Sequence, residues 1–250
     1  MITSQPRAFG LIVIGDELLL GDREDRHLPF FRQLLKERGD LLKRCWILPD
    51  EFEELTHQLR LSLDQALPTF VCGGIGATPD DLTRGCAAAA AGVGLVRHPE
   101  AAALIEGRFG EAAYPERIHM ADLPAGSRLI PNLYNQIAGF SLGEHHFLPG
   151  FPEMAWPMAR WVLESHYPRL DETPARPSRE ASLRVVDASE NELIPVMREL
   201  SVRFPGLKMF SLPHLGETRY VELGFRGQGE LQLALAALRQ ALDARSIDYR

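Results

Sequence analysis

The segment that most constrains the fold joins a short apolar run to a glycine-rich turn. Residues 69–72 (TFVC) have strand character, and glycines follow directly at Gly73, Gly74 and Gly76. Glycine adopts positive φ angles and lets the backbone approach a ligand closely. The segment therefore predicts a strand that ends in a tight turn.

An alanine-rich stretch follows this turn and predicts a helix over residues 80–91. Thr78 is a good N-cap, Pro79 suits the first helical position, and Asp80 and Asp81 favour the positive end of the helix dipole. A strand end, a glycine turn and a helix start together form a phosphate site. Because two carboxylates would repel a phosphate, we expect a metal ion between them. The alternative is a turn needed only for helix–strand packing.

Strands and helices are expected to alternate along the first two thirds of the chain. Apolar runs predict strands at residues 8–14, 41–48, 69–72, 128–130, 139–142 and 145–148. Apolar residues at helical spacing predict helices at residues 28–38, 51–67, 80–91, 99–109 and 153–167. This alternation implies right-handed crossovers. We therefore predict an α/β fold with a mainly parallel sheet between two helical layers.

A charged segment with three prolines, residues 168–180, lacks apolar periodicity and predicts a linker. It would separate an α/β domain at residues 1–167 from a small domain at residues 181–250. In the second part we expect strands at residues 181–186, 207–212 and 220–225, and helices at residues 190–203 and 230–244. That order predicts a βαββα domain of the α+β class.

Composition narrows the classes of partner. The formal net charge of the 250 residues is −7, which argues against binding to nucleic acid or to an anionic membrane. No apolar run approaches the length of a membrane span, and no signal peptide is recognised. The three cysteines show no metal-ligand spacing and leave one unpaired in any disulfide scheme. We expect a cytoplasmic protein.

Acidic residues follow three of the predicted strands. Asp16 and Glu17 come after Gly15 at the end of the first strand, Asp50 follows the second, and Asp81 follows the glycine turn. Ligands of parallel α/β sheets bind outside the carboxyl ends of the strands. We therefore expect these carboxylates at one edge of the sheet. Taken singly, each acid could also be a helix cap or a first-turn charge.

Three ordered motifs carry a family resemblance: GDELLLG at residues 15–21, GGIGATPDDLT at residues 73–83 and LPGFPEM at residues 148–154. Residues 7–167 resemble the molybdopterin-binding domain of the competence/damage-inducible protein A family, and the tail resembles the small domain that follows it. The same fold serves molybdopterin adenylyltransferases, and some competence-type members are metal-dependent pyrophosphatases acting on ADP-ribose or FAD. The amidohydrolase domain of longer family members is not part of the sequence.

The resemblance implies roles for particular residues. Asp81 and the Asp50 of a Pro-Asp-Glu motif match family positions that serve metal and pyrophosphate chemistry, so we expect both to be catalytic and to bind the metal. The implied ion is Mg²⁺ or Co²⁺, with K⁺ as a further candidate, and the implied ligand is molybdopterin or a nucleotide. The expected ligand-binding residues are Gly15, Asp16, Glu17, Gly73, Gly74, Gly76, Thr78, Asp80, Asn132, Gly139, Pro149 and Gly150.

Two positions depart from the family pattern. The family usually has Asn-Pro-x-Gly-x-Ala-Pro-Gly where residues 132–139 are NLYNQIAG, so we expect a different loop there. The usual asparagine near the first helix start is His27, although Asp25 is retained.

From these observations we expect a metal-dependent nucleotide pyrophosphatase that acts on ADP-ribose or FAD. The alternatives are a molybdopterin adenylyltransferase and a non-catalytic module that binds a pterin or a nucleotide. The expected partner is a small phosphate-bearing molecule, and we expect a homo-oligomer whose subunit count the sequence leaves open.

Overall fold

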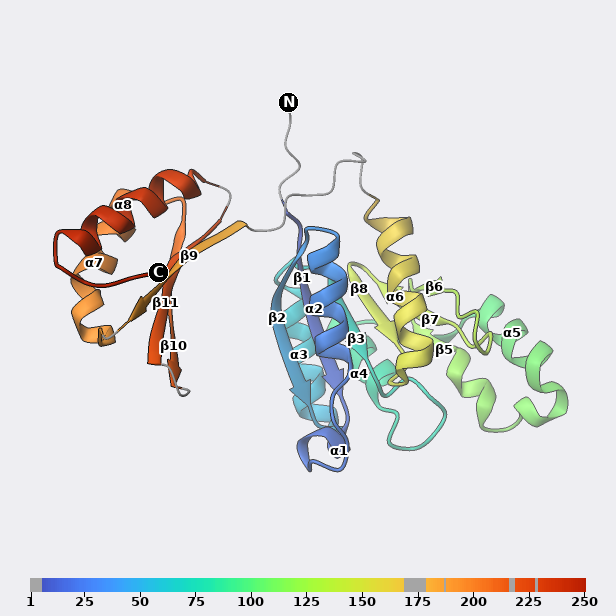
Figure 1. Ribbon diagram of the computed structural model, residues 1–250. Helices are drawn as coiled ribbons and strands as arrows, with labels where there is room; N and C mark the ends of the chain where they lie inside the picture. The colour runs from blue at the N-terminus through green and yellow to red at the C-terminus, as the bar shows by residue number, and fades with distance from the viewer. Residues whose placement is uncertain (1–5, 169–178, 187, 216–218, 228) are drawn as a thin grey trace. The chain divides into compact units, whose positions relative to one another are not determined.

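The computed structural model describes residues 6–168, 179–186, 188–215, 219–227 and 229–250. The expected linker at residues 168–180 lies mostly outside these ranges. The chain divides into two compact units, Met1–Ala175 and Arg176–Arg250, and Figure 1 shows their elements. None of the described helices is long and apolar enough to cross a membrane.

The first unit is built on a six-stranded sheet in the order β2-β1-β3-β8-β7-β6. These strands are β1 (Ala8–Ile14), β2 (Leu41–Leu48), β3 (Thr69–Cys72), β6 (Arg128–Ile130), β7 (Gly139–Leu142) and β8 (His145–Leu148). The pairs β1–β2, β1–β3 and β3–β8 are parallel, whereas β8–β7 and β7–β6 are antiparallel. All six strands occupy the predicted residues, and the mainly parallel sheet is confirmed.

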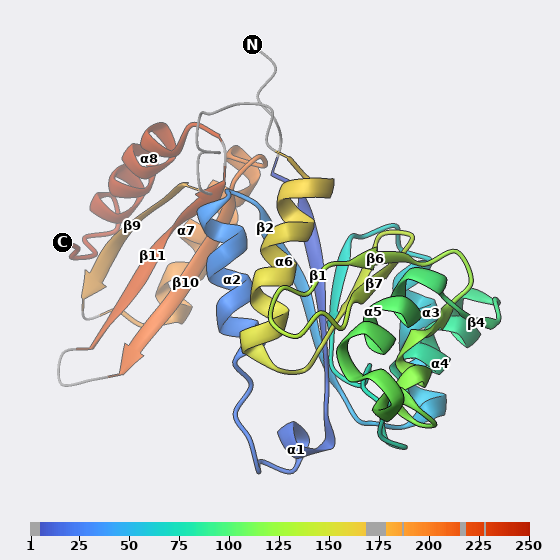
Figure 2. The same ribbon diagram turned by 90° about the vertical axis from the view of Figure 1, so that its right-hand side faces the viewer.

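Helices cover both faces of this sheet (Figures 1 and 2). One face packs on α2 (His27–Glu37) and α6 (Pro152–His166), around Phe31 and Met158. The other face packs on α3 (Phe52–Leu63), α4 (Thr83–Ala91) and α5 (Pro99–Phe109). Short elements complete the unit: α1 (Asp16–Leu19), β4 (Leu95–Arg97), β5 (Asp122–Pro124), η1 (Gly110–Ala113) and η2 (Arg117–Ala121).

The central strands are apolar on both sides because both faces are covered. In β1, alternate residues join different cores: Leu11 and Val13 pack toward α2 and α6, while Ile12 and Ile14 pack toward the opposite layer. This double burial is why β1 appears in the sequence as a continuous apolar run and not as an alternating one.

The second unit has the predicted βαββα order. Its antiparallel sheet, in the order β10-β11-β9, consists of β9 (Arg179–Val186), β10 (Lys208–Leu215) and β11 (Arg219–Gly227). The helices α7 (Glu190–Arg203) and α8 (Leu231–Asp243) bury a separate core with this sheet. A capping box between Ser189 and Glu192 begins α7.

The core of the second unit shares no residues with the two cores of the first unit. We therefore predict that a chain ending at Pro168 folds by itself. It should give one cooperative thermal transition by circular dichroism and bind the same ligands as the full chain. The shortened chain would contradict this prediction if it aggregated or melted without cooperativity.

Candidate functional site

A cavity of about 700 Å³ opens at the carboxyl ends of the parallel strands. Its wall includes Gly15 after β1, Asp50 after β2, Gly73 after β3 and Gly150 after β8. The volume lies within the range of typical small-molecule pockets. The convergence expected of three strand ends is therefore observed, and the end of β8 adds a fourth.

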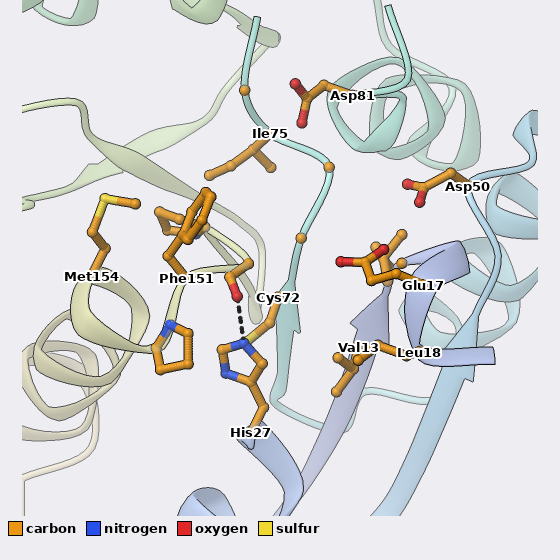
Figure 3. A pocket seen from close by; sticks show the side chains of 18 of the residues that line it. Val13, Glu17, Leu18, His27, Asp50, Cys72, Ile75, Asp81, Phe151 and Met154 are labelled. Carbon is orange, nitrogen blue, oxygen red and sulfur yellow. Dashed lines mark hydrogen bonds between the residues drawn. The ribbon is translucent and has the colours of Figure 1, made fainter. Parts of the chain in front are cut away.

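Most of the predicted site residues line this cavity. They are Gly15, Glu17, Asp50, Gly73, Gly74, Gly76, Thr78, Asp80, Asp81, Pro149 and Gly150. Asp16, Asn132 and Gly139 are outside the lining. Figure 3 shows Glu17, Asp50 and Asp81 on one side of the cavity, while Phe151 and Met154 are on the other.

The glycine turn depends on close approaches between backbone segments. Gly73 and Gly74 have φ angles of 116° and 66°, which side-chain-bearing residues rarely adopt. A Cβ at Gly73 would collide with the Ile14 carbonyl, and one at Gly74 would collide with the Thr83 hydroxyl. The Gly73 amide already donates to the Leu148 carbonyl at 3.0 Å, so this amide is engaged within the protein.

The predicted helix start was wrong. The helix begins at Thr83 and not near residue 80, because Thr78 and Asp81 form a local turn instead. The Asp81 Oδ2 accepts hydrogen bonds from the Thr78 amide at 2.8 Å and from the Thr78 hydroxyl at 2.5 Å. Thr83 then ties the helix to the turn, since its hydroxyl donates to the Gly73 carbonyl at 2.9 Å.

Asp16 and Asp50 hold each other's backbone. The Asp16 amide donates to Asp50 Oδ2 at 3.2 Å, and the Asp50 amide donates to Asp16 Oδ1 at 3.1 Å. This reciprocal pair connects the turn after β1 to the turn after β2. Asp16 therefore fixes the position of a cavity carboxylate without lining the cavity itself.

The charge around Asp50 disfavours its ionised form. Burial raises the pKa of Asp50 above its ordinary value of 3.8. The nearby negative charges of Asp16, Glu17 and Asp80 raise it further, while the hydrogen bond from the Asp16 amide opposes this shift. A bound cation would relieve the same repulsion.

Arg84 holds the far end of the glycine turn. Its guanidinium donates to the Gly76 carbonyl at 2.7 Å and to the His119 carbonyl. Burial lowers the pKa of this group, against the attraction of Asp81 and Asp122. Because Nη1 and Nη2 donate to backbone carbonyls, Arg84 shapes the turn that borders the cavity.

His27 joins two cavity walls. It lies buried at the start of α2, and its Nε2 is 2.9 Å from the Gly150 carbonyl, which places the proton on Nε2 (Figure 3). Burial lowers its pKa, so the ring is neutral. Asp25 begins the helix by accepting from the amides of His27 and Leu28 at 2.8 and 2.9 Å.

Asn132 and Gly139 shape the loop that departs from the family pattern. The side-chain Nδ2 of the buried Asn132 donates to Asn135 Oδ1 at 2.8 Å and to the Ile137 carbonyl at 3.1 Å. A Cβ at Gly139 would collide with the Phe147 carbonyl, so Gly139 serves strand packing. It is Asn135 and Ile137 from this loop that reach the cavity wall.

Sequence reasoning did not select several lining residues as site residues. Besides His27, Asn135 and Ile137, they include Ile75, Met120, Phe151 and Met154. Apolar side chains in loops resemble packing residues in a sequence. Phe151 belongs to the LPGFPEM motif and directly follows Gly150, an expected ligand-binding residue. This position is the one sequence signal that points to the cavity.

The wall carries an excess of negative charge. Seven carboxylates but only two guanidinium groups belong to the lining. Both arginines pair with acids, Arg23 with Glu17 at 3.6 Å and Arg26 with Glu153 at 3.5 Å. Among the described residues, no three His, Cys, Asp or Glu side chains come together as a complete metal site. Asp50 and Asp81 supply the type of ligand that Mg²⁺ uses, since this ion is often held by one or two carboxylates, water and substrate phosphates.

Replacement of Asp50 by Asn should stabilise the protein near neutral pH. A carboxyl whose pKa is raised by folding releases its proton less readily in the folded state, so its ionisation lowers stability as pH rises above about 3.8. Asp50→Asn removes this penalty and keeps an acceptor for the Asp16 amide. We expect a higher Tm at about pH 7 and no gain at about pH 3, with Asp64→Asn, an exposed acid outside the cavity, as control. A lower Tm at pH 7 would contradict the charge argument.

Asp16 should act through its hydrogen bond and not through its charge. Asp16→Asn retains an acceptor for the Asp50 amide, whereas Asp16→Ala removes it. We expect the alanine variant to lose about 1 kcal/mol of unfolding free energy, and the asparagine variant to lose less than half of that. Urea denaturation measures both, and equal losses would argue against the reciprocal pair.

Comparisons with known proteins identify relatives of this chain. A family model described as a probable molybdopterin binding domain matches residues 10–172. A CinA-like protein from Anaeromyxobacter sp. (strain K) is 33% identical over 173 residues, which are 66% of this chain and 42% of that protein. A CinA-like protein from Citrifermentans bemidjiense is 29% identical over 259 residues, which are 96% of this chain and 61% of that protein. The chain thus spans less than two thirds of the length of these curated relatives.

A solved structure agrees with these sequence matches. The crystal structure of the protein CinA with unknown function from Thermoplasma acidophilum superposes with a TM-score of 0.59 at 26% identity. The match covers 64% of this chain and 98% of that chain. The similarity therefore extends to the fold of the unit that contains the cavity.

Proposed function

The chain belongs to the molybdopterin-binding domain family that includes the CinA-like proteins, and we propose that it is a metal-dependent nucleotide pyrophosphatase acting on ADP-ribose or FAD. The observation that carries this proposal is the pairing of a glycine turn with an acidic wall in one cavity. A pyrophosphate cannot approach such a wall without a cation.

Asp50 and Asp81 would hold the ion. Each uses Oδ2 as a hydrogen-bond acceptor within the protein, which orients the carboxylate. When bound, a divalent ion would neutralise phosphate oxygens and favour attack by water. Hydrolysis of ADP-ribose would give AMP and ribose 5-phosphate.

Adenylyl transfer from ATP to molybdopterin is the competing reaction, since it would use the same carboxylates and turn. The loop at residues 132–139 favours hydrolysis over transfer, because the segment that departs from the family pattern supplies Asn135 and Ile137 to the wall. A binding module without turnover is the third candidate, and the same loop supports it.

Incubation with ADP-ribose or FAD and Mg²⁺ or Co²⁺ should release AMP, as measured by chromatography, and a chelator should abolish the release. Asp81→Asn should lower turnover by at least about a hundredfold, because the carboxamide oxygen can still accept from the Thr78 amide but the neutral group no longer attracts a cation. Asp64→Asn, an exposed acid outside the lining, is the matched control and should keep full activity.

The outcome separates the three functions. Formation of adenylylated pterin from ATP and molybdopterin, without AMP release from ADP-ribose or FAD, would refute the hydrolase and support the transferase. Tight binding of a nucleotide or pterin without turnover of either substrate set would leave the binding module.

A further inference from the structure

Phe151 is an aromatic residue that the protein leaves uncovered inside its cavity. The residue is 57% exposed although it lines the cavity, and it belongs to neither of the buried clusters that the structure describes in this unit. Leu148 and Ala155, three and four residues away in the chain, are by contrast fully buried. Burial in the core therefore does not explain a phenylalanine at this position.

The backbone beneath this ring is held firmly. The Phe151 carbonyl accepts from the amides of Met154 and Ala155 at 3.0 and 2.9 Å, so the residue caps α6. On the other side, the Gly150 carbonyl is bound by His27. A Cβ at Gly150 would be 3.4 Å from the Gly73 Cα, which means that this turn packs on the glycine turn. The ring therefore stands on a preorganised support.

The cavity is apolar around this ring and acidic opposite it. Ile75, Met120, Ile137 and Met154 are further apolar residues of the lining. In Figure 3 the Phe151 ring stands between Met154 and Ile75, while Glu17 and Asp50 lie across the cavity. A ligand that fills both parts needs a charged group at one end and a flat apolar surface at the other.

We propose that Phe151 is the platform on which the planar heteroaromatic ring of the ligand stacks. The inference rests on the proposed function only in assigning the ligand to this cavity, and it does not require turnover. A phenylalanine face is suited to offset stacking with a purine, flavin or pterin ring, and methionine sulfur packs well beside such rings. The platform would select a nucleotide or pterin over a sugar phosphate that lacks a ring.

The test compares two ligands that differ in the ring. Binding of AMP and of ribose 5-phosphate to the full chain with Mg²⁺ is measured by calorimetry for the wild type, Phe151→Ala and Phe151→Trp. FMN serves as a second ring-bearing probe, followed by the quenching of its fluorescence. Tyr134→Ala is the matched control, because Tyr134 is 70% exposed in the neighbouring loop but is not part of the lining.

We expect the wild type to bind AMP or FMN more tightly than ribose 5-phosphate. Phe151→Ala should weaken binding of the ring-bearing ligand about tenfold and leave ribose 5-phosphate unchanged. Phe151→Trp should retain wild-type affinity within about threefold, and Tyr134→Ala should change nothing. Thermal melts establish that each variant is folded.

Several results would overturn the platform. They are equal affinity of the wild type for ring-bearing and ringless phosphates, an unchanged affinity of Phe151→Ala for AMP and FMN, or an equal loss for all ligands in that variant. The pyrophosphatase can fail separately: absence of AMP release together with Phe151-dependent AMP binding would refute hydrolysis and support the platform. Conversely, hydrolysis with an unchanged KM in Phe151→Ala would support the enzyme and refute the platform.

Discussion

The parallel pairing of β1 with β2 and β3, and of β3 with β8, is the constraint on which the site depends. Parallel strands in register end at the same edge, so the turns that follow them must meet there. Residues from four separate parts of the chain become neighbours as a result. The same pairing requires helices on both faces, and these faces supply the two cores that hold the edge in place.

At that edge the protein brings together carboxylates whose negative charges repel one another. Asp50 has a raised pKa because burial and neighbouring acids disfavour its charge, yet Asp16 hydrogen bonds keep it in position. Carboxylates with perturbed pKa values are common at sites where they serve a ligand and not the fold. Backbone contacts made by Arg84 and His27 then fix the glycine turn and the adjoining turn at Gly150, both of which line the cavity.

The cavity also separates polar from apolar chemistry. Six of the seven lining carboxylates come from the segments after β1, β2 and β3, whereas Phe151 and Met154 lie at the start of α6 beside the seventh, Glu153, which is paired with Arg26. A cation and a phosphate suit the first part, and a flat ring suits the second. The loop at residues 132–139, whose sequence departs from the family pattern, contributes Asn135 and Ile137 to the wall. Ligand preference can therefore differ from that of relatives without any change in the carboxylates.

The sequence by itself determined the six strands of the main sheet, most helices, the sheet class and the strand ends that carry the site, because apolar periodicity and glycine turns are local signals, but it did not predict the short strands β4 and β5. It also identified Asp50 and Asp81 by their place in motifs. Only the tertiary structure decided that α4 begins at Thr83, since the amide and the hydroxyl of Thr83 are bound to the Gly74 and Gly73 carbonyls of the glycine turn. Likewise, the supporting role of Asp16 and the exposure of Phe151 depend on contacts between distant segments, and no local pattern in the chain encodes such contacts.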